Sequence, residues 1–313
     1  MTCKKCGYDF VFDPKRHQTT DGKFLATVHR ASSNDTYHFT ANQLYAAACR
    51  RLRGSLIPLI FFVMVAFVTF IVLFSGASPP IGVLLFIGLF TLILALGSYY
   101  GIRPKLPRKK WNKHLKRWQK LRPPLRKLIR SPELNSPPPE CDEPDIYDYG
   151  VEQVLICERE EVVDWLVLNR YHVTTKTAVI SEDGYPHYLI PKIQTLLASE
   201  HPPTIYLLHD SGHDSQSMIT RVRESQLFDL YEADIIDLGL TPDLVPKIKS
   251  LKNVRRSLKS DTIPVDTIPF GTLTTMTTCA FASHCAFTAF QSGSAGETSM
   301  EFETSCSDDG DGE

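Results

Sequence analysis

Hydrophobic and polar positions along the chain single out two apolar stretches. Residues 56–74 and 81–97 contain no charged residue and are 19 and 17 residues long. As helices they would measure about 28 Å and about 25 Å, close to the roughly 30 Å hydrocarbon core of a bilayer. The residues between them, 75–80, are uncharged and include two prolines and a glycine. The pattern predicts a two-helix transmembrane hairpin over residues 55–100.

A second pattern follows the hairpin, because residues 151–252 alternate short apolar runs with amphipathic segments. Continuous apolar strands separated by helices are typical of a parallel sheet that is covered on both faces. The sequence therefore predicts an α/β domain with a Rossmann-like sheet. Its predicted strands are 153–157, 177–180, 204–208 and 234–238, and its predicted helices are 160–168, 188–199 and 215–225.

The segments around these two parts have their own patterns. Residues 1–54 are mostly polar and predict a small N-terminal module, in which 39–49 read as an amphipathic helix with Thr40 as its N-cap. Within residues 101–130, Trp111, Leu115 and Trp118 share one face of a predicted basic helix. Three further segments complete the prediction: an acidic, proline-rich linker over 131–150, the α/β domain, and a poorly structured acidic tail over 253–313.

Charge blocks predict how the chain is oriented in a membrane. Residues 103–130 carry 13 Lys and Arg and no acid, and Arg50, Arg51 and Arg53 precede the first apolar stretch. Basic residues next to membrane spans favour the cytoplasmic side, so both termini are expected there. The basic helix would then contact anionic lipid headgroups. Lysines interleaved with tryptophans are also compatible with nucleic acid. No signal peptide pattern precedes the hairpin, and a cytoplasmic location argues against a disulfide framework.

Two cysteines near the N-terminus suggest a metal site. Cys3 and Cys6 are followed by a glycine, a spacing that can direct two thiolates at one zinc ion. Tetrahedral zinc requires two further ligands, and the nearby candidates are His17, His29, His38 and Cys49. The alternative is a pair of free cysteines in a turn. The pair therefore predicts either a zinc or redox-sensing module or no metal at all.

Acidic residues follow three of the predicted strands. Glu158 follows the first, Asp183 follows the second, and Asp210 and Asp214 follow the third. Ligands gather at the carboxyl ends of strands in open α/β sheets, and converging carboxylates suit Mg²⁺. The alternative is that these acids are solvated loop residues or cap the following helices. His209 and His213 flank the same loop and offer a second metal reading, although histidines there also serve as hydrogen-bonded loop residues.

At these residues the domain resembles the Toprim fold, most closely that of the A subunit of type IIB topoisomerases. The shared outline is Val-Leu-Ile-Cys-Glu over 154–158, Gly-Tyr-Pro over 184–186, and Ile-Tyr-Leu-Leu-His-Asp over 205–210. In that family the glutamate after the first strand and an Asp-x-Asp after the third bind Mg²⁺ and act on phosphodiesters. The resemblance therefore implies catalytic, metal-binding roles for Glu158 and Asp210.

The chain departs from the family in two respects. The second aspartate of the pair is replaced by Gly212, and the next acid is Asp214. In the topoisomerases the tyrosine that cleaves DNA lies on a winged-helix domain upstream, whereas this chain has a linker and a membrane hairpin there. Strand cleavage through a phosphotyrosine is therefore not expected.

Three functional hypotheses follow. The first is a membrane-anchored protein whose degenerate Toprim-like domain binds a partner or ligand, and the Gly212 departure favours it. The second is a Mg²⁺-dependent enzyme acting on phosphodiesters or nucleic acid through Glu158 and Asp210, and the third is a membrane regulator that senses zinc or redox state. The sequence has no phosphate-binding glycine loop, and its apolar stretches have no ionisable residue of the kind that marks a transport pathway.

Overall fold

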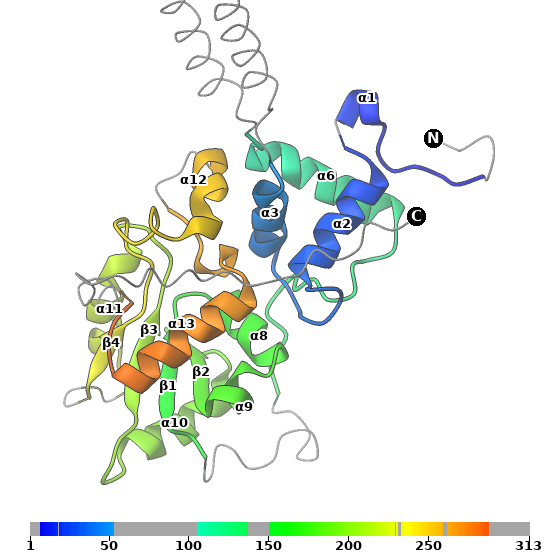
Figure 1. The fold of residues 1–313 in the computed structure, drawn as a ribbon. Helices are drawn as coiled ribbons and strands as arrows, with labels where there is room; N and C mark the ends of the chain where they lie inside the picture. Colours follow the sequence, from blue (N-terminus) through cyan, green and yellow to red (C-terminus); the bar gives the residue numbers. More distant parts are fainter. Residues whose placement is uncertain are drawn as a thin grey trace, which may run out of the picture.

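The computed structural model describes residues 7–17, 19–52, 105–136, 150–228, 230, 233–258 and 262–287. Within them, a cluster of helices from the N-terminal residues and α6 packs beside a sheet with helices on both faces (Figure 1). The helices of this cluster are α1 (Pro14–His17), α2 (Asp21–Ala31), α3 (Ala41–Arg50) and α6 (Arg108–Leu121).

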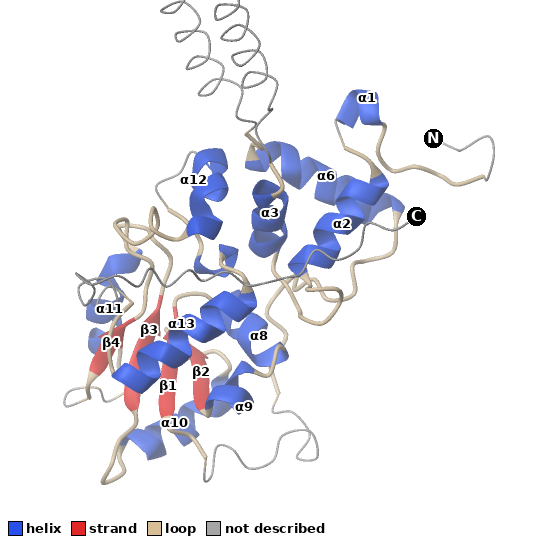
Figure 2. Cartoon of the chain, viewed as in Figure 1, coloured by secondary structure: helices blue, strands red, loops and turns tan. Residues whose placement is uncertain are grey.

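Four parallel strands form the sheet, in the order β2-β1-β3-β4 (Figure 2). Because every neighbouring pair is parallel, all four carboxyl ends lie at one edge of the sheet. The structure confirms the predicted α/β fold and its parallel sheet, and each strand boundary agrees with the prediction to within one residue. The strands are β1 (Gln153–Cys157), β2 (Thr177–Ser181), β3 (Thr204–Leu208) and β4 (Ile235–Asp237).

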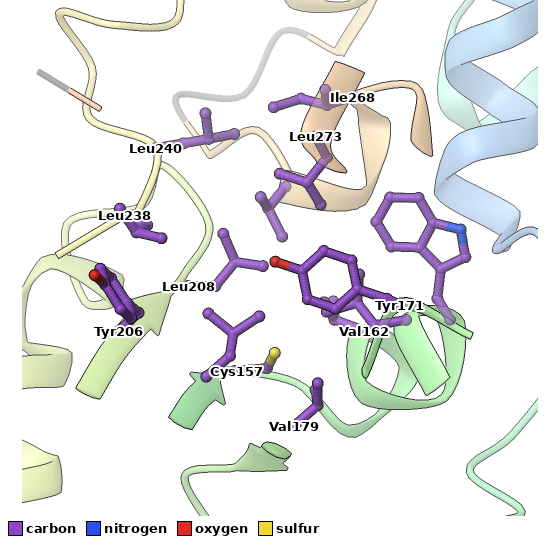
Figure 3. Close-up of a cluster of buried hydrophobic side chains, with 14 of the residues drawn as sticks. Cys157, Val162, Tyr171, Val179, Tyr206, Leu208, Leu238, Leu240, Ile268 and Leu273 are labelled. Atoms are coloured by element: carbon purple, nitrogen blue, oxygen red, sulfur yellow. The ribbon is translucent and has the colours of Figure 1, made fainter. Parts of the chain in front are cut away.

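Side chains of the strands alternate between two buried faces. On one face, Leu155, Tyr206 and Leu208 pack in a cluster with residues of α8 (Glu160–Leu168), α9 (Tyr171–Thr175) and α13 (Phe270–Ser283). Figure 3 shows part of this cluster, in which Tyr171 and Leu208 lie near Leu273. On the other face, apolar strand residues pack against η1 (His187–Leu189), α10 (Ile190–Leu197) and α11 (Met218–Glu224). Burial on both faces explains why the strands have continuous apolar sequences.

The prediction that residues from 253 onward are poorly structured is wrong for 253–258 and for 262–287. After η3 (Lys249–Leu251) and α12 (Lys252–Leu258), the chain forms η4 (Val265–Thr267) and then α13. Helix α13 lies across the sheet in Figure 1, and its Phe270, Leu273 and Phe281 belong to the main core cluster. These residues are therefore part of the α/β body. Residues 288–313, with the acids of the predicted tail, lie outside the described residues.

Stacked aromatic rings hold the N-terminal cluster of helices together. The ring of Phe24 lies 4.7 Å from that of Trp118 and 5.6 Å from that of Trp111, and Phe12 stacks on Trp118 at 6.1 Å. Both tryptophans are only 5% exposed. The apolar face of the basic helix is thus covered by the N-terminal residues of the chain. Periodicity identified this face correctly. Because protein covers it, contact of the basic helix with anionic headgroups stays a prediction for its exposed Lys and Arg side chains.

Helix α3 begins as predicted. Thr40 is its N-cap, and the Thr40 hydroxyl accepts a hydrogen bond from the backbone N–H of Gln43 at 3.1 Å. A hydroxyl in this position satisfies one of the backbone donors that the first turn leaves without a partner. Nearly all of α3 is buried, because it lies between α2 and the segment that carries η4 and α12. The helix therefore joins the N-terminal cluster to the α/β body.

The buried imidazole of His114 predicts that this cluster is sensitive to acid. His114 is 7% exposed, and burial lowers its pKa, with a further decrease from the charges of Lys110, His17 and Arg117. The unfolded chain, in contrast, takes up a proton at histidine near pH 6.5. Because the folded pKa is the lower one, this contribution to stability is fully present above about pH 6.5 and is lost as the pH falls through the folded pKa.

We therefore expect the cluster to unfold at lower urea concentration at about pH 5 than at about pH 7. Fluorescence of the tryptophans in the cluster measures the transition. The variant His114→Gln should reduce the difference between the two pH values, whereas His213→Gln, at a fully exposed side chain, should leave it unchanged. An unchanged pH dependence in His114→Gln would contradict this account.

Several predicted features fall outside the described residues. These are the apolar stretches 56–74 and 81–97, the pair Cys3 and Cys6, and most of the predicted linker. Among the described residues, no helix is long and apolar enough to cross a membrane. The start of the linker is held against the α/β body, because the N–H of Glu133 donates to Asp164 at 2.8 Å and that of Leu134 donates to the Tyr185 hydroxyl at 2.5 Å.

Candidate functional site

The carboxyl edge of the sheet carries one acidic residue for each strand. In the order of the sheet these are Glu182 after β2, Glu158 after β1, Asp210 after β3, and Asp237 at the end of β4. Parallel strands bring these side chains to one edge, where α/β proteins usually place their ligands. The partners of each carboxylate decide what chemistry this edge can support.

Glu158 and Asp210 lie side by side. The backbone N–H of Asp210 donates to Glu158 Oε2 at 2.8 Å, and the hydroxyl of Ser215, in η2 (Ser215–Ser217), donates to Glu158 Oε1 at 2.7 Å. Both oxygens of Glu158 are therefore engaged by groups from the loop that follows β3. The two residues that the sequence singled out are brought together by direct contact between their loops.

A guanidinium group neutralises Asp210. Nε of Arg159 lies 3.1 Å from Asp210 Oδ2, and the N–H of Val265 donates to Asp210 Oδ1 at 2.8 Å. The pKa of Asp210 is raised to about 6, mainly by burial. The charge of Arg159 lowers this pKa, whereas the neighbouring carboxylates of Asp266 and Glu158 raise it. The cation beside Asp210 is thus supplied by the residue that follows Glu158 in the chain.

The same guanidinium group binds a second, fully buried carboxylate. Nη2 of Arg159 lies 2.6 Å from Asp266 Oδ1, and the Asp266 side chain is 0% exposed. Asp266 also accepts hydrogen bonds from the Thr40 hydroxyl at 2.5 Å and from Asn42 Nδ2 at 3.1 Å. Arg108, the first residue of α6, donates in turn to the side-chain oxygen Oδ1 of Asn42. This network joins the sheet edge to α3, to α6 and to η4.

The electrostatics of the network favour a permanently charged arginine. Burial lowers the pKa of Arg159, but the attraction of Asp266 and Asp210 outweighs this effect and holds its pKa above the usual value. Two buried acids therefore share one cation from the protein itself. Buried charges are usually paired in this way, because an unpaired charge in the interior is costly.

Glu182 and Glu158 face a second arginine. Arg221 of α11 donates three hydrogen bonds to Glu182, at 2.8, 3.1 and 3.2 Å, and its Nη2 lies 3.9 Å from Glu158 Oε1. Burial raises the pKa of Glu182, and its hydrogen bonds with Arg221 oppose this increase. The acid that turns toward the site after β2 is thus Glu182, whereas the predicted Asp183 is exposed to solvent.

The third predicted magnesium ligand is not part of the site. The Asp214 side chain is fully exposed, and its nearest ionic partner is the equally exposed His213 at 4.0 Å. At Gly212, the family's second aspartate position, an added Cβ would lie 3.2 Å from both Ser215 Oγ and the Thr262 side chain. A side chain at position 212 would therefore be crowded. The predicted metal site at His209 and His213 is not formed either, because the His213 side chain is exposed to solvent whereas that of His209 is buried.

His209 pairs with the acid of β4 instead. Its Nε2 lies 3.0 Å from Asp237 Oδ1, and its Nδ1 lies 2.6 Å from the backbone carbonyl oxygen of Asp210. Both ring nitrogens thus face acceptors, which fits the imidazolium form. Burial lowers the pKa of His209, whereas the hydrogen bonds to Asp237 and Asp210 raise it. The hydrogen bonds outweigh burial, so the pKa of His209 lies above its usual value. This pair ties β3 to β4.

These contacts show what the edge can do chemically. Within the described residues, no group of three or more His, Cys, Asp or Glu side chains is arranged to hold a metal ion. Each strand-end carboxylate is instead paired with a cationic side chain. The residues at this edge therefore do not fit a Mg²⁺ ion in the manner of the Toprim family. The carboxylate of Asp210 is already paired with Arg159, and the second aspartate is missing.

Sequence reasoning missed both arginines of the site and three of its acids, Glu182, Asp237 and Asp266. Arg159 is adjacent to Glu158 and could have been noticed, while Arg221 lies on a predicted helix without any distinguishing pattern. Asp266 lies in a segment for which no element was predicted. Comparisons of this chain with protein-family models, with curated proteins and with solved structures found no match.

Proposed function

We propose that this protein is a membrane-anchored, non-catalytic module, whose degenerate Toprim-like domain is presented to the cytoplasm to bind a partner or ligand. The observation that carries the proposal is the position of Arg159, whose guanidinium group lies between Asp210 and Asp266. In a working Toprim site a divalent cation would occupy the place next to the aspartate. Here an arginine supplies that positive charge permanently.

The Toprim-like assignment is supported by the relative placement of the quoted motifs. Glu158 follows β1, the central strand beside β3, and Asp210 follows β3, so both acids lie at the same edge. The 184–186 motif begins the turn before η1 and α10. Loss of the second aspartate at Gly212 and gain of the Arg159 bridge both argue for a site that has lost its metal.

Membrane anchoring is supported by the sequence. Two uncharged apolar stretches of bilayer length lie between Leu52 and Lys105, where the described part of the chain is interrupted. Helix α3 ends two residues before this gap, and helix α6 begins shortly after it. Both helices contribute to the same buried hydrophobic cluster. The basic residues that flank the stretches favour a cytoplasmic α/β domain, on the side where anionic headgroups would be available to α6.

The test is a calorimetric titration of the chain, held in detergent micelles, with Mn²⁺ and with Mg²⁺. We expect no saturable binding at millimolar concentrations, because Asp210 is already paired and Asp214 lies in solvent. The variants Asp210→Ala and Asp214→Ala serve as a matched pair, and circular dichroism checks that each is folded. Saturable binding to the wild type that disappears in Asp210→Ala and persists in Asp214→Ala would overturn the proposal in favour of a Mg²⁺-dependent enzyme.

A further inference from the structure

Exposed apolar side chains gather at one end of the N-terminal cluster. Three of the five large hydrophobic residues that are exposed in the described part of the chain come from two short segments: Tyr8 at 37%, Phe10 at 42% and Leu121 at 54%. The first segment precedes α1, and the second is the last residue of α6. Single exposed apolar residues need no explanation, whereas a gathering of them marks an interaction site.

Arg122 joins the two segments into one surface. Its guanidinium carbon lies 4.6 Å from the centre of the Tyr8 ring, and its Nη2 donates to the carbonyl oxygen of Asp9 at 2.6 Å. The rings of Tyr8 and Phe10 lie edge to face at 5.0 Å. We call this surface the aromatic patch, and define it by Tyr8, Phe10, Leu121 and Arg122. Its rings are held in place by protein contacts while their faces remain partly open to solvent.

The two helices that adjoin the segments of the aromatic patch, α1 and α6, are basic. Helix α6 has no acidic residue, and the neighbouring helix α1 adds two more exposed basic residues. Asp9 is the exposed acid within the patch itself. The exposed basic residues of these two helices are Lys15, Arg16, Lys109, Lys113, Lys116, Arg117 and Lys120, of which Lys120 is adjacent to Leu121 in the chain. Aromatic and leucine side chains rimmed by Lys and Arg are the combination that proteins present to the headgroup region of a bilayer.

We propose that the aromatic patch is a second membrane contact, which docks on an anionic bilayer surface with its rings and Leu121 among the lipid headgroups. The inference rests on the proposed membrane anchoring, because α6 begins a few residues after the second apolar stretch and is held near the same bilayer. Tethering of this kind makes a weak contact effective without a high affinity of its own. Leu121 favours lipid over nucleic acid, since an aliphatic side chain offers no stacking surface to a base.

The structure also explains why this contact differs from the one expected from the sequence. The Trp111 and Trp118 side chains, which periodicity placed on one face of the basic helix, stack on Phe24 in the interior. What the cluster leaves exposed is the end of α6 and the residues before α1. The large apolar side chains that this end of the cluster offers to a membrane are therefore those of the aromatic patch, not the tryptophans.

Tryptophan fluorescence in reconstituted vesicles tests the proposal. The variant Leu121→Trp adds an indole to the patch. Val173→Trp adds one at another exposed position, on α9, which Figure 1 places at the opposite end of the molecule from α6. The three native tryptophans are at most 5% exposed and give a constant background. Vesicles contain phosphatidylcholine with phosphatidylserine, and their acyl chains are brominated in half of the samples.

We expect brominated lipid to quench the added emission from position 121 and to leave that from position 173 unchanged. Quenching should weaken in vesicles of phosphatidylcholine alone and in the variant that combines Leu121→Trp with Lys120→Glu. Equal emission at position 121 with and without bromine would overturn the proposal, as would a shift of that emission by a single-stranded oligonucleotide but not by lipid. Carbonate extraction of the vesicles separates the two ideas: if the chain stays in the membrane while position 121 is not quenched, the patch fails and the anchor stands.

Discussion

Replacing Asp266 with alanine is expected to lower the free energy of unfolding by about 3–5 kcal/mol, the usual cost of removing one partner from a buried ion pair. The substitution leaves the Arg159 guanidinium with Asp210 alone, and it deprives the Thr40 hydroxyl and the Asn42 amide of their acceptor. All three donors are buried or half-buried, so water replaces the lost carboxylate poorly. Urea denaturation of the chain in detergent micelles, followed by circular dichroism, measures the effect.

A matched control separates burial from charge pairing as such. Glu152 and Lys176 form an ion pair at 2.5 Å, but both side chains are more than half exposed. Glu152→Ala should therefore cost no more than about 1 kcal/mol. The variant Asp266→Asn keeps the shape of the side chain and is expected to be nearly as destabilising as Asp266→Ala, because the charge and one acceptor oxygen are lost. Equal costs for Asp266→Ala and Glu152→Ala would show that the buried network contributes little.

The same substitution has a local signature. Since Thr40 and Asn42 belong to the start of α3, loss of Asp266 should speed hydrogen exchange in the first turn of that helix more than in β1 or β3. This outcome would identify Asp266 as the residue that couples the N-terminal cluster to the sheet edge. Uniform acceleration throughout the chain would indicate general destabilisation instead.

The strands could be predicted because their burial leaves a direct trace in the sequence. A parallel strand covered on both faces needs apolar residues at consecutive positions, as in 154–157 and 205–208, and polar residues bound each run. The order of the strands has no such trace. It was the chemistry of the strand ends, through Glu158 and Asp210, that indicated a common edge.

Helix α13 was missed because its composition argues against a helix. Five of its fourteen residues are threonine, which has a low helix propensity. In the structure some of these hydroxyls donate to backbone carbonyls one turn earlier, such as Thr274 to Phe270 at 3.0 Å. Burial of apolar side chains against the sheet outweighs the weak propensity, and no local pattern reveals that the sheet is there.

The site was predicted in outline for a related reason. Strand ends can be located from local sequence, whereas the partners of the acids cannot. Asp266 lies 107 residues from Arg159 and 226 residues from Thr40 along the chain. Only the fold brings these groups together. The tryptophan face of α6 shows the same limit, because periodicity identifies an apolar stripe without identifying what covers it.

Replacing Gly239 with alanine is expected to destabilise the chain by about 1–3 kcal/mol, the usual cost of overpacking an interior. An added Cβ would lie 1.9 Å from Nε2 of His209, within the imidazole ring's own volume. The ring is 1% exposed and is held by Asp237 and by the Asp210 carbonyl, so it cannot move without breaking one of these contacts. Because Asp210 also donates to Glu158, the disturbance reaches the carboxyl edge of the sheet.

A double-mutant cycle makes this prediction specific to the ring. His209→Ala removes the obstacle, so the cost of Gly239→Ala should be at least about 0.5 kcal/mol smaller in that background than in the wild type. Gly271→Ala is the matched control, since an added Cβ at this exposed helical position meets nothing within 4 Å. There the exchange should be neutral or stabilising, because alanine favours a helix over glycine. If the changes in unfolding free energy of Gly239→Ala and His209→Ala were strictly additive, the imidazole ring would not be the reason that position 239 requires glycine.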